Sequence, residues 1–175
     1  MQNTFFQRLM VGTITSLSLG ACQNHSSVSL SSEHDATAKV NRVMDAWHHA
    51  ASVADSSAYF GAMASNKSIF IGTDETERWT TSEFKTWSRR YFQRASAWTF
   101  VPVEGERHVQ AQGDVAWLDE KLDSEHMGRC RGTGILTFDH GTNTWKIAHY
   151  TLSYAVPNEV ADSVMQVIQR WNDSK

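Results

Sequence analysis

The sequence predicts an α+β domain in which helices gather on one face of an antiparallel sheet. Apolar residues recur at helical spacing in the first half of the chain and again near its end. Between Trp98 and Leu152 the pattern changes to strand-like alternation, interrupted by turn signals at Gly105 and at residues 112–114. Helices followed by a run of consecutive strands are typical of the α+β class.

The first 22 residues have the layout of an export signal. They contain one basic residue, Arg8, no acidic residue, an apolar stretch from Leu9 to Leu19, and small residues before Cys22. The apolar stretch is shorter than the roughly 20 residues that a helix needs to cross a bilayer. A cleavable signal peptide over residues 1–21 is therefore favoured over a permanent transmembrane helix.

The four residues Leu19-Gly20-Ala21-Cys22 resemble the lipobox of bacterial lipoproteins. The resemblance implies cleavage after Ala21 and lipid on Cys22, and several acyl chains on one cysteine hold a protein firmly to a membrane. It implies a lipid-anchored location in the cell envelope, facing the periplasm. Because Gln23 is not the aspartate that retains lipoproteins at the inner membrane, the outer membrane is preferred for a Gram-negative host. A plain secretory signal is the alternative.

Residues 22–32 are Ser-rich and predict a flexible tether, which leaves residues 33–175 as one domain. Removal of the signal peptide changes the net charge from −3 to −4, because Arg8 is lost. This charge argues against nucleic acid as a partner. With Cys22 lipidated, Cys130 has no partner for a structural disulfide and is expected to be buried as a small apolar residue.

Helical periodicity predicts three helices before the main run of strands. The first covers about 33–53, and a short second one is capped by Asp55. A strand over 68–71 and a polar loop follow, and Thr80 with Glu83 forms a capping-box pattern that opens the third helix. The apolar positions of these helices are Val40, Val43, Met44, Trp47, Ala51 and Ala54, then Tyr59, Phe60 and Met63, then Phe84, Trp87, Tyr91 and Phe92.

Four consecutive antiparallel strands are predicted over about 97–109, 114–123, 129–138 and 144–153. Pro102 lacks a backbone donor, so it is expected on an edge strand or at a bulge. A last helix, capped by Asn158, is predicted from the helical spacing of Val160, Val164, Val167, Ile168 and Trp171.

The last strand carries apolar residues on both faces if it alternates regularly. Trp145 and Ile147 then lie on one face of the strand, and Ala148, Tyr150 and Leu152 lie on the other. A sheet with two apolar faces needs two covers, and the helices supply one. We therefore expect the other face to meet a partner subunit or enclose a cavity, and we expect a homodimer through the face that holds Trp145 and Ile147.

Four segments together resemble the SnoaL-like branch of the nuclear transport factor 2-like superfamily. They are FIGTDETERWT (70–80), DVAWLDEKLD (114–123), GRCRGTGILTF (128–138) and WKIAHYTLSYAVPNEVAD (145–162). The resemblance implies a cone, in which a strongly curved antiparallel sheet wraps around about three helices and a pocket opens at one end. It also implies frequent dimerisation through the sheet. Members include isomerases, hydrolases, cyclases and noncatalytic modules, so fold alone does not decide the chemistry.

Strand parity places Glu120 on the apolar face of its strand, beside Leu118 and Leu122, with Asp119 on the opposite face. A carboxylate in apolar surroundings needs a partner, or its pKa rises. Arg131 on the next strand is the expected partner, because a guanidinium forms two-pronged pairs with carboxylates. These three residues are predicted to form the polar centre of a ligand pocket, and a structural salt bridge is the alternative.

Trp79 and Trp98 stand beside polar segments at element ends, and with Tyr150 they are the predicted walls of this pocket. Gly132 and Gly134 leave a strip without side chains, for which sheet curvature is the favoured interpretation. His149 and Tyr150 point to opposite faces, so at most one of them faces the cavity. No cofactor is expected, because the histidine and cysteine spacings match no metal site and there is no phosphate-binding or dinucleotide-binding glycine motif.

Three functions stay open at this point. The first is a membrane-anchored domain that binds a small polar or anionic molecule in its cone. The second is a cofactor-independent isomerase, hydrolase or dehydratase that uses pocket carboxylates as acid and base. The third is a noncatalytic module for envelope assembly. A pocket in which every charge is paired favours binding, whereas a buried and unpaired carboxylate favours catalysis.

Overall fold

The computed structural model describes residues 25–175, with side chains from residue 33 onwards. The predicted signal peptide and Cys22 lie outside the described residues. Within the described part, α1 (His25–Ser52) is the longest helix. It begins at His25, so most of the predicted tether 22–32 is helical; the serine-rich composition did not indicate this extension. None of the described helices is long and apolar enough to cross a membrane.

Local sequence signals set the starts of the two short helices as predicted. Helix α2 (Ser56–Gly61) begins where the Asp55 carboxylate accepts a hydrogen bond from the Ala58 amide at 2.9 Å. Helix α3 (Thr81–Ser88) begins with a complete capping box, in which Thr80 and Glu83 bond each other's backbone amides.

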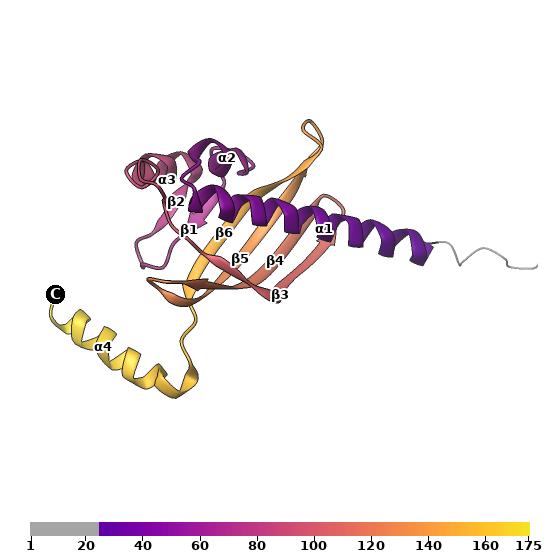
Figure 1. Ribbon diagram of the computed structural model, residues 1–175. Coiled ribbons are helices and arrows are strands. Elements are labelled where there is room, and N and C mark those ends of the chain that lie inside the picture. Colours follow the sequence, from indigo (N-terminus) through magenta and orange to yellow (C-terminus); the bar gives the residue numbers. More distant parts are fainter. Residues whose placement is uncertain (1–24) are drawn as a thin grey trace, which may run out of the picture.

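The sheet has six strands in the order β2-β1-β6-β5-β4-β3 (Figure 1). The long strands β3 (Val101–Gln112), β4 (Val115–Ser124), β5 (Gly128–Asp139) and β6 (Thr144–Tyr154) are consecutive and antiparallel, as predicted. The short strands β1 (Ile69–Ile71) and β2 (Arg78–Thr80) extend it, and β1 runs parallel to β6. The sheet is therefore mixed, and β2 occupies part of the chain for which a loop was expected.

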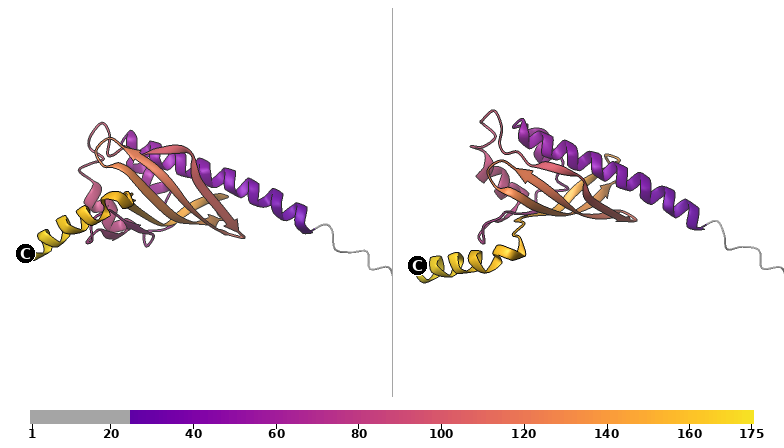
Figure 2. Two further views of the ribbon diagram at one scale, coloured as in Figure 1. Left: turned by 90° about the horizontal axis from the view of Figure 1, so that it is seen from below. Right: turned by 60° about the horizontal axis from the view of Figure 1, so that its bottom comes forward.

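Helix α1 lies across the concave face of the curled sheet, and α2 and α3 cover the end near β1 and β2 (Figures 1 and 2). Val40, Met44, Trp47 and Ala51 of α1 are at most 3% exposed, and they follow the helical spacing that predicted this face. Cys130 of β5 is fully buried in the same core and is a free thiol, as expected.

The prediction that both faces of β6 are apolar is wrong, because a bulge changes the parity of the strand. Ile135 pairs with His149 but Leu136 pairs with Ile147, so one extra residue, Ala148, is accommodated in β6. As a result Trp145, Ile147, Tyr150 and Leu152 all face the helices and are at most 7% exposed. The face that holds Trp145 and Ile147 is thus the core of one chain and not a dimer surface.

Strand β3 is an edge strand with an irregular start. Its pairing with β4 shifts between Pro102 and Arg107, and Gly105 in this stretch has a positive φ of 74°. Pro102 therefore lies both on an edge and at a bulge, as its missing donor predicted.

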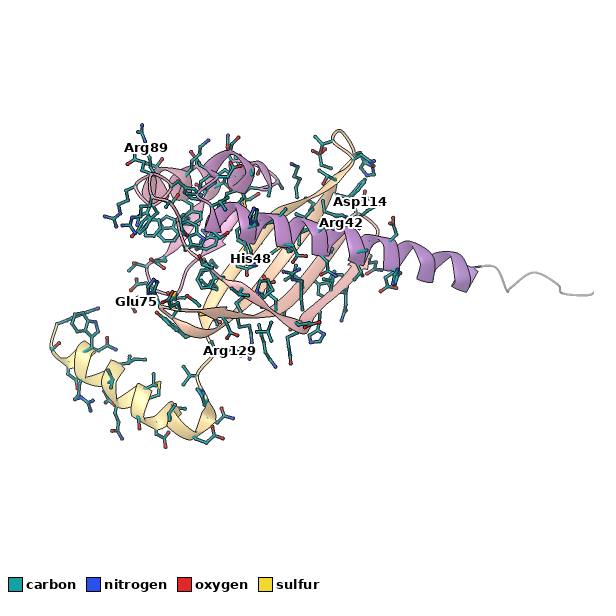
Figure 3. All side chains as sticks on the ribbon, in the orientation of Figure 1. Arg42, His48, Glu75, Arg89, Asp114 and Arg129 are labelled. Carbon is teal, nitrogen blue, oxygen red and sulfur yellow. The ribbon has the colours of Figure 1, made fainter. Side chains whose placement is uncertain are left out.

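The C-terminal helix extends away from the body of the domain. A turn of 3₁₀ helix, η1 (Asn158–Val160), precedes α4 (Ala161–Asp173), so Asn158 does not cap the α-helix itself. Figure 3 shows the α4 side chains projecting into open space. Its predicted apolar stripe is largely solvent-exposed, and Trp171 is 63% exposed.

Candidate functional site

Glu120 lies at the centre of a polar cluster buried between α1 and the sheet. Parity predicted its inward position, and the residue is 1% exposed. One carboxylate oxygen, Oε1, bonds His48 Nε2 at 2.8 Å and accepts from the Tyr150 hydroxyl at 2.7 Å. The other, Oε2, accepts from Arg107 Nε at 2.7 Å. The carboxylate thus has three side-chain partners, from α1, β3 and β6.

These partners keep Glu120 ionised. Burial by itself raises the pKa of Glu120, but the hydrogen bond and charge of His48, together with Arg107 and Tyr150, lower it from 4.5 to about 2. In the same cluster burial and the adjacent Glu120 charge raise the pKa of the Tyr150 hydroxyl well above its usual value. At neutral pH Glu120 is therefore an anion that accepts hydrogen bonds, and Tyr150 is a neutral donor.

Arg107 ties this cluster to the first helix. Its Nη1 donates to the Asp45 carboxylate at 2.7 Å and to the Asn41 carbonyl oxygen at 3.3 Å. The side chain of Arg107 is 10% exposed and that of Asp45 is 64% exposed. The guanidinium therefore bridges a buried carboxylate and a surface carboxylate. Asp45, at the solvent side, is the weaker of the two anchors because it is hydrated.

The expected partnership of Glu120 with Arg131 is wrong. Glu120 is paired across the β4–β5 ladder with Gly132, and Arg131 is paired with Lys121 on the outer face. Arg131 and Asp119 are both exposed on that outer face, away from the cone. Of the three residues predicted as the polar centre, the structure places Glu120 alone inside.

Sequence reasoning missed His48 and Arg107. For His48, the available signal was its helical spacing: it follows Met44 by one turn, so it faces the core. Figure 3 shows His48 pointing from α1 towards the sheet. For Arg107, the signal was the hairpin turn at residues 113–114, which places Arg107 directly opposite Glu120.

The two glycines of β5 make room for the Tyr150 ring. A β-carbon on Gly132 would lie 1.9 Å from the Tyr150 hydroxyl oxygen, and one on Gly134 would lie 3.2 Å from a carbon of the ring. Sheet curvature is the interpretation that the sequence favours for this strip, and the packing adds a close contact with a neighbouring side chain. Gly132 is therefore required for the hydrogen bond between Tyr150 and Glu120.

Beyond this cluster a pocket of about 190 Å³ opens at the end of the cone near α3. Both tryptophans that were predicted as walls, Trp79 and Trp98, line it. Phe84 stacks on Phe70 at 4.2 Å between ring centroids and on Trp79 at 5.2 Å, so one wall is a pile of parallel rings. The other lining residues are Gly72, Thr73, Glu77, Trp87, Phe100, Met127 and Leu152.

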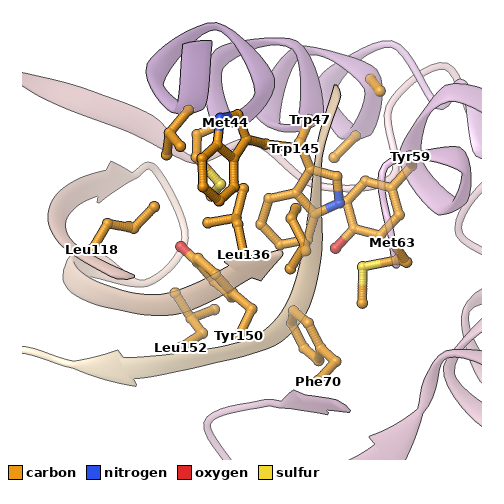
Figure 4. Packing of buried hydrophobic residues seen from close by; sticks show 14 of the residues in the cluster. Met44, Trp47, Tyr59, Met63, Phe70, Leu118, Leu136, Trp145, Tyr150 and Leu152 are labelled. Atoms are coloured by element: carbon orange, nitrogen blue, oxygen red, sulfur yellow. The ribbon is translucent and has the colours of Figure 1, made fainter. Parts of the chain in front are cut away.

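A small inner cavity lies between this pocket and the polar cluster. The two spaces share Phe70, Trp98, Phe100 and Leu152 in their walls. The inner one is lined in addition by Trp47, His48, Tyr59 and Tyr150, and its volume of about 10 Å³ admits one water-sized group. Figure 4 shows Trp47, Tyr59, Phe70 and Tyr150 gathered in this part of the core. The cone is thus aromatic at its mouth and polar at its inner end.

The outer pocket does not have the charge that an anionic ligand needs. Among the described residues that line it, Glu77 alone is charged, and it is acidic. Arg107 is engaged with Glu120 and Asp45, and Arg131 lies on the other side of the sheet. The walls therefore suit a neutral apolar molecule better than the polar or anionic one expected from sequence.

His149 and the candidate metal ligands do not add a further site to the cone. His149 faces outwards opposite Ile135, so Tyr150 is the member of that pair that lines the cavity. Within the described residues, no three histidine, cysteine or acidic side chains come together as a set of metal ligands.

Comparison with known families agrees with this geometry. The family model of the SnoaL-like domain matches residues 40–157. The chain belongs to the SnoaL-like family. Among curated proteins none matches the chain. The matched part of the SnoaL-like domain contains every residue of the polar cluster and of both cavities, and it ends before η1 and α4.

Solved structures confirm the cone fold of the SnoaL-like domain. A protein from Streptomyces avermitilis, named as a candidate dehydratase of the NTF2-like family, superposes with a TM-score of 0.58 at 13% identity, over 71% of this chain and 98% of that one. An NTF2-like protein of unknown function from Pseudomonas putida gives a TM-score of 0.56 at 14% identity, over 75% and 92%. A candidate ketosteroid isomerase from Parabacteroides distasonis gives 0.53 at 17% identity, over 67% and 86%. At these identities the likeness shows the fold alone.

Proposed function

We propose that this SnoaL-like domain binds a small, flat, neutral molecule in its aromatic pocket. The observation that carries the proposal is the composition of the pocket, whose walls contain three tryptophans, three phenylalanines, a methionine and a leucine around about 190 Å³. Aromatic and apolar walls with few polar groups are the usual features of ligand pockets. The Glu120 carboxylate has three hydrogen-bond partners, and a carboxylate that is paired in this way favours ligand binding over catalysis by that carboxylate.

Flat aromatic probes test the proposal directly. Acetylnaphthalene is expected to bind the purified domain and to change its tryptophan fluorescence. Trp79→Leu should weaken binding about tenfold, which corresponds to a loss of about 1.4 kcal/mol. Trp117→Leu on the outer face is the matched control, because Trp117 is 41% exposed and lies away from the cone. Equal binding by wild type and Trp79→Leu, or binding by neither, contradicts the proposal.

Acid and base catalysis by His48 is the second candidate function. His48 lines the inner cavity, and its Nε2 is held by Glu120 at 2.8 Å. A carboxylate that orients an imidazole is a common arrangement in acid–base sites. In this scheme His48 exchanges the proton, and Glu120 is a positioning residue. An enolisable ketone incubated with the domain in D₂O would exchange its α-hydrogens, and His48→Gln would abolish the exchange while acetylnaphthalene still binds.

We also propose that the domain is held on the cell envelope through lipid on Cys22. The support is the sequence Leu19-Gly20-Ala21-Cys22 at the end of a signal-like segment. Labelled palmitate should be incorporated into wild type and into Cys130→Ser, and not into Cys22→Ser. Cys130 is the appropriate control because it is fully buried in β5. Cys22→Ser protein that is labelled and fractionates like wild type would overturn this anchor.

We also propose that the protein forms a homodimer through the outer face of the sheet. Val115, Trp117 and Ile135 are 41–44% exposed there, and Trp117 pairs directly with Ile135 across the β4–β5 ladder. Neighbouring exposed apolar side chains on a sheet favour a protein partner. A second copy would supply the same surface about a two-fold axis.

A further inference from the structure

The inner cavity contains hydrogen-bond donors for which the described residues supply no acceptor. The Tyr59 hydroxyl and the Trp47 Nε1–H are both buried, at 1% and 3% residue exposure, and neither has a hydrogen-bond partner in the described part of the chain. Both residues line the inner cavity. Buried polar groups in folded proteins are nearly always satisfied, so two such groups at the end of a pocket require an explanation.

The two aromatic rings that carry these donors lie next to each other. The rings of Trp47 and Tyr59 stack at 4.8 Å between centroids, and Figure 4 shows the Tyr59 hydroxyl at the inner end of its ring, beside the Trp47 indole. Burial raises the pKa of the Tyr59 hydroxyl well above its usual value and outweighs the opposite effect of the Trp98 indole N–H, which can supply a proton but cannot accept the one on Tyr59. Tyr59 is therefore neutral at physiological pH and keeps its proton for donation.

The carboxylate of the polar cluster does not accept these protons. Glu120 accepts from His48, Tyr150 and Arg107, whereas Tyr59 belongs to α2 and stacks on the Trp47 ring without a hydrogen bond to Glu120. The inner cavity thus offers indole and phenol donors, and its volume of about 10 Å³ admits one water-sized group, which is the size of a single oxygen atom. An acceptor oxygen is the complementary group.

The charges of Glu77 and Glu120 indicate that this acceptor oxygen belongs to a neutral group. A carboxylate on the ligand would approach Glu77 in the outer pocket and the ionised Glu120 beyond it, and the described residues that line the two cavities include no unpaired cation to offset the repulsion. A carbonyl oxygen accepts two hydrogen bonds and carries no charge. It also lies in the plane of an attached aromatic ring, which fits a flat body in the outer pocket.

We infer that Tyr59 and Trp47 form a subsite for the carbonyl oxygen of a flat, neutral ligand whose apolar body occupies the outer pocket. The inference rests on the proposed binding function and names the ligand chemistry of that site. The Tyr59 hydroxyl and the Trp47 indole N–H donate to the carbonyl oxygen, and Trp79 and Trp98 contact the rings.

A matched pair of probes tests the inference. Acetylnaphthalene presents a carbonyl oxygen, and isopropenylnaphthalene has nearly the same shape with a methylene group in its place. Wild type is expected to bind the ketone about fivefold to tenfold more tightly than the hydrocarbon, as one or two buried hydrogen bonds imply. Tyr59→Phe should remove most of this preference without weakening hydrocarbon binding. Tyr91→Phe is the control, because Tyr91 contacts Trp98 from outside the two cavities and its hydroxyl accepts from Arg90.

The infrared stretch of the bound ketone gives a second, independent readout. In wild type the carbonyl band should shift to lower frequency than in an apolar solvent, and in Tyr59→Phe and Trp47→Phe part of that shift should be lost. If both probes bind wild type equally and the band does not shift, the carbonyl subsite is wrong while the binding function stands. If neither probe binds the folded domain, the proposed function fails and the subsite fails with it. Naphthoate bound more tightly than the ketone would also overturn the subsite, because it would show an anion site.

Discussion

His48 Nε2 lies 2.8 Å from Glu120 Oε1, although the two residues are 72 positions apart in the chain. Because Glu120 is ionised and accepts, His48 is the donor in this contact. The bond joins α1 to β4, the neighbour of the edge strand β3, at the inner end of the cone. The same carboxylate therefore contributes to stability and fixes the ring that borders the inner cavity.

Acidification should destabilise the domain through Glu120. The pKa of this group is about 2 in the folded state against 4.5 ordinarily. A lowered folded-state pKa stabilises at pH values above the unfolded value, and the stabilisation is lost as the pH falls from about 4.5 towards 2. At 1.36 kcal/mol per pKa unit the loss amounts to about 3 kcal/mol in the free energy of unfolding. Urea unfolding at a series of pH values measures it.

Glu120→Gln supplies the comparison for this pH series. Its free energy of unfolding is expected to be lower than that of wild type at pH 7 and to depend less on pH between 5 and 2, by about the same 3 kcal/mol. Asp119→Asn, one position along on the outer face, should leave the wild-type pH dependence in place. Parallel curves for wild type and Glu120→Gln would show that another carboxylate dominates acid unfolding.

Arg107 and Arg131 should respond differently to the same substitution. Arg107→Met leaves Glu120 buried without its guanidinium, and breaking such a pair typically costs about 3–5 kcal/mol. Arg131→Met is the matched control. It removes an exposed side chain from the outer face and should change stability by no more than about 0.5 kcal/mol.

The double variant Arg107→Met, Glu120→Leu checks the cause of the Arg107 effect. Removing both charges should recover part of the stability that Arg107→Met loses, because no carboxylate is then stranded. Chemical denaturation of wild type, Arg107→Met, Glu120→Leu and the double variant completes a double-mutant cycle. A loss in Arg131→Met as large as that in Arg107→Met would mean that the outer face carries the important charge.

The contrast between these arginines also shows what the sequence could predict. Arg107 is six positions before Gly113 and Glu120 is six positions after Asp114, so the two-residue turn at 113–114 places them opposite each other. Gly113 and Asp114 mark the turn in the sequence, and counting residue pairs outwards from it gives the register that the structure shows. Arg131 was chosen because it lies on the following strand, but β5 presents Gly132 to Glu120 and turns Arg131 to the other face.

Features that depend on local spacing could be predicted, whereas features that depend on a bulge or on helix packing could not. The capping box at Thr80 and the inward face of Glu120 depend on spacing, and both were predicted correctly. The bulge at Ala148 reverses the parity of β6 without any glycine or proline to mark it, so regular alternation predicts an outer surface at Trp145 and Ile147 where the structure has the core. The approach of His48 to Glu120 depends on how α1 crosses the sheet, which single-strand periodicity does not determine.

Gly132 should be far less tolerant of a side chain than Gly134. A β-carbon at Gly132 would lie 1.9 Å from the Tyr150 hydroxyl oxygen, so the ring must move and its bond to Glu120 is lost. Overpacking of this kind costs about 1–3 kcal/mol. At Gly134 the nearest atom is a ring carbon at 3.2 Å, and a shift of a few tenths of an ångström relieves the contact. Thermal unfolding of Gly132→Ala and Gly134→Ala measures the difference.

Tyr150→Phe tests whether the cost of Gly132→Ala comes from the Tyr150 hydroxyl or from the backbone at residue 132. It removes the hydroxyl that a new β-carbon would meet, together with the hydrogen bond to Glu120. Gly132→Ala should therefore destabilise Tyr150→Phe less than it destabilises wild type, since residues in contact are not additive. Equal costs in both backgrounds would show that the glycine matters for backbone conformation and not for Tyr150.

The outer face of the sheet should hold two copies together, and a charge placed there should separate them. Trp117 and Ile135 are directly paired on β4 and β5 and are 41% and 44% exposed, so a dimer that buries this face would place them near its two-fold axis. Ile135→Lys then brings two positive charges close together in an apolar interface. The dissociation constant should rise by at least about 100-fold, or about 2.7 kcal/mol. Sedimentation velocity over a range of protein concentrations measures it. Trp171→Lys on α4 is the control, because Trp171 is also exposed, at 63%, but belongs to the projecting helix. If Trp171→Lys dissociates the dimer and Ile135→Lys does not, the contact is made by α4 and not by the sheet.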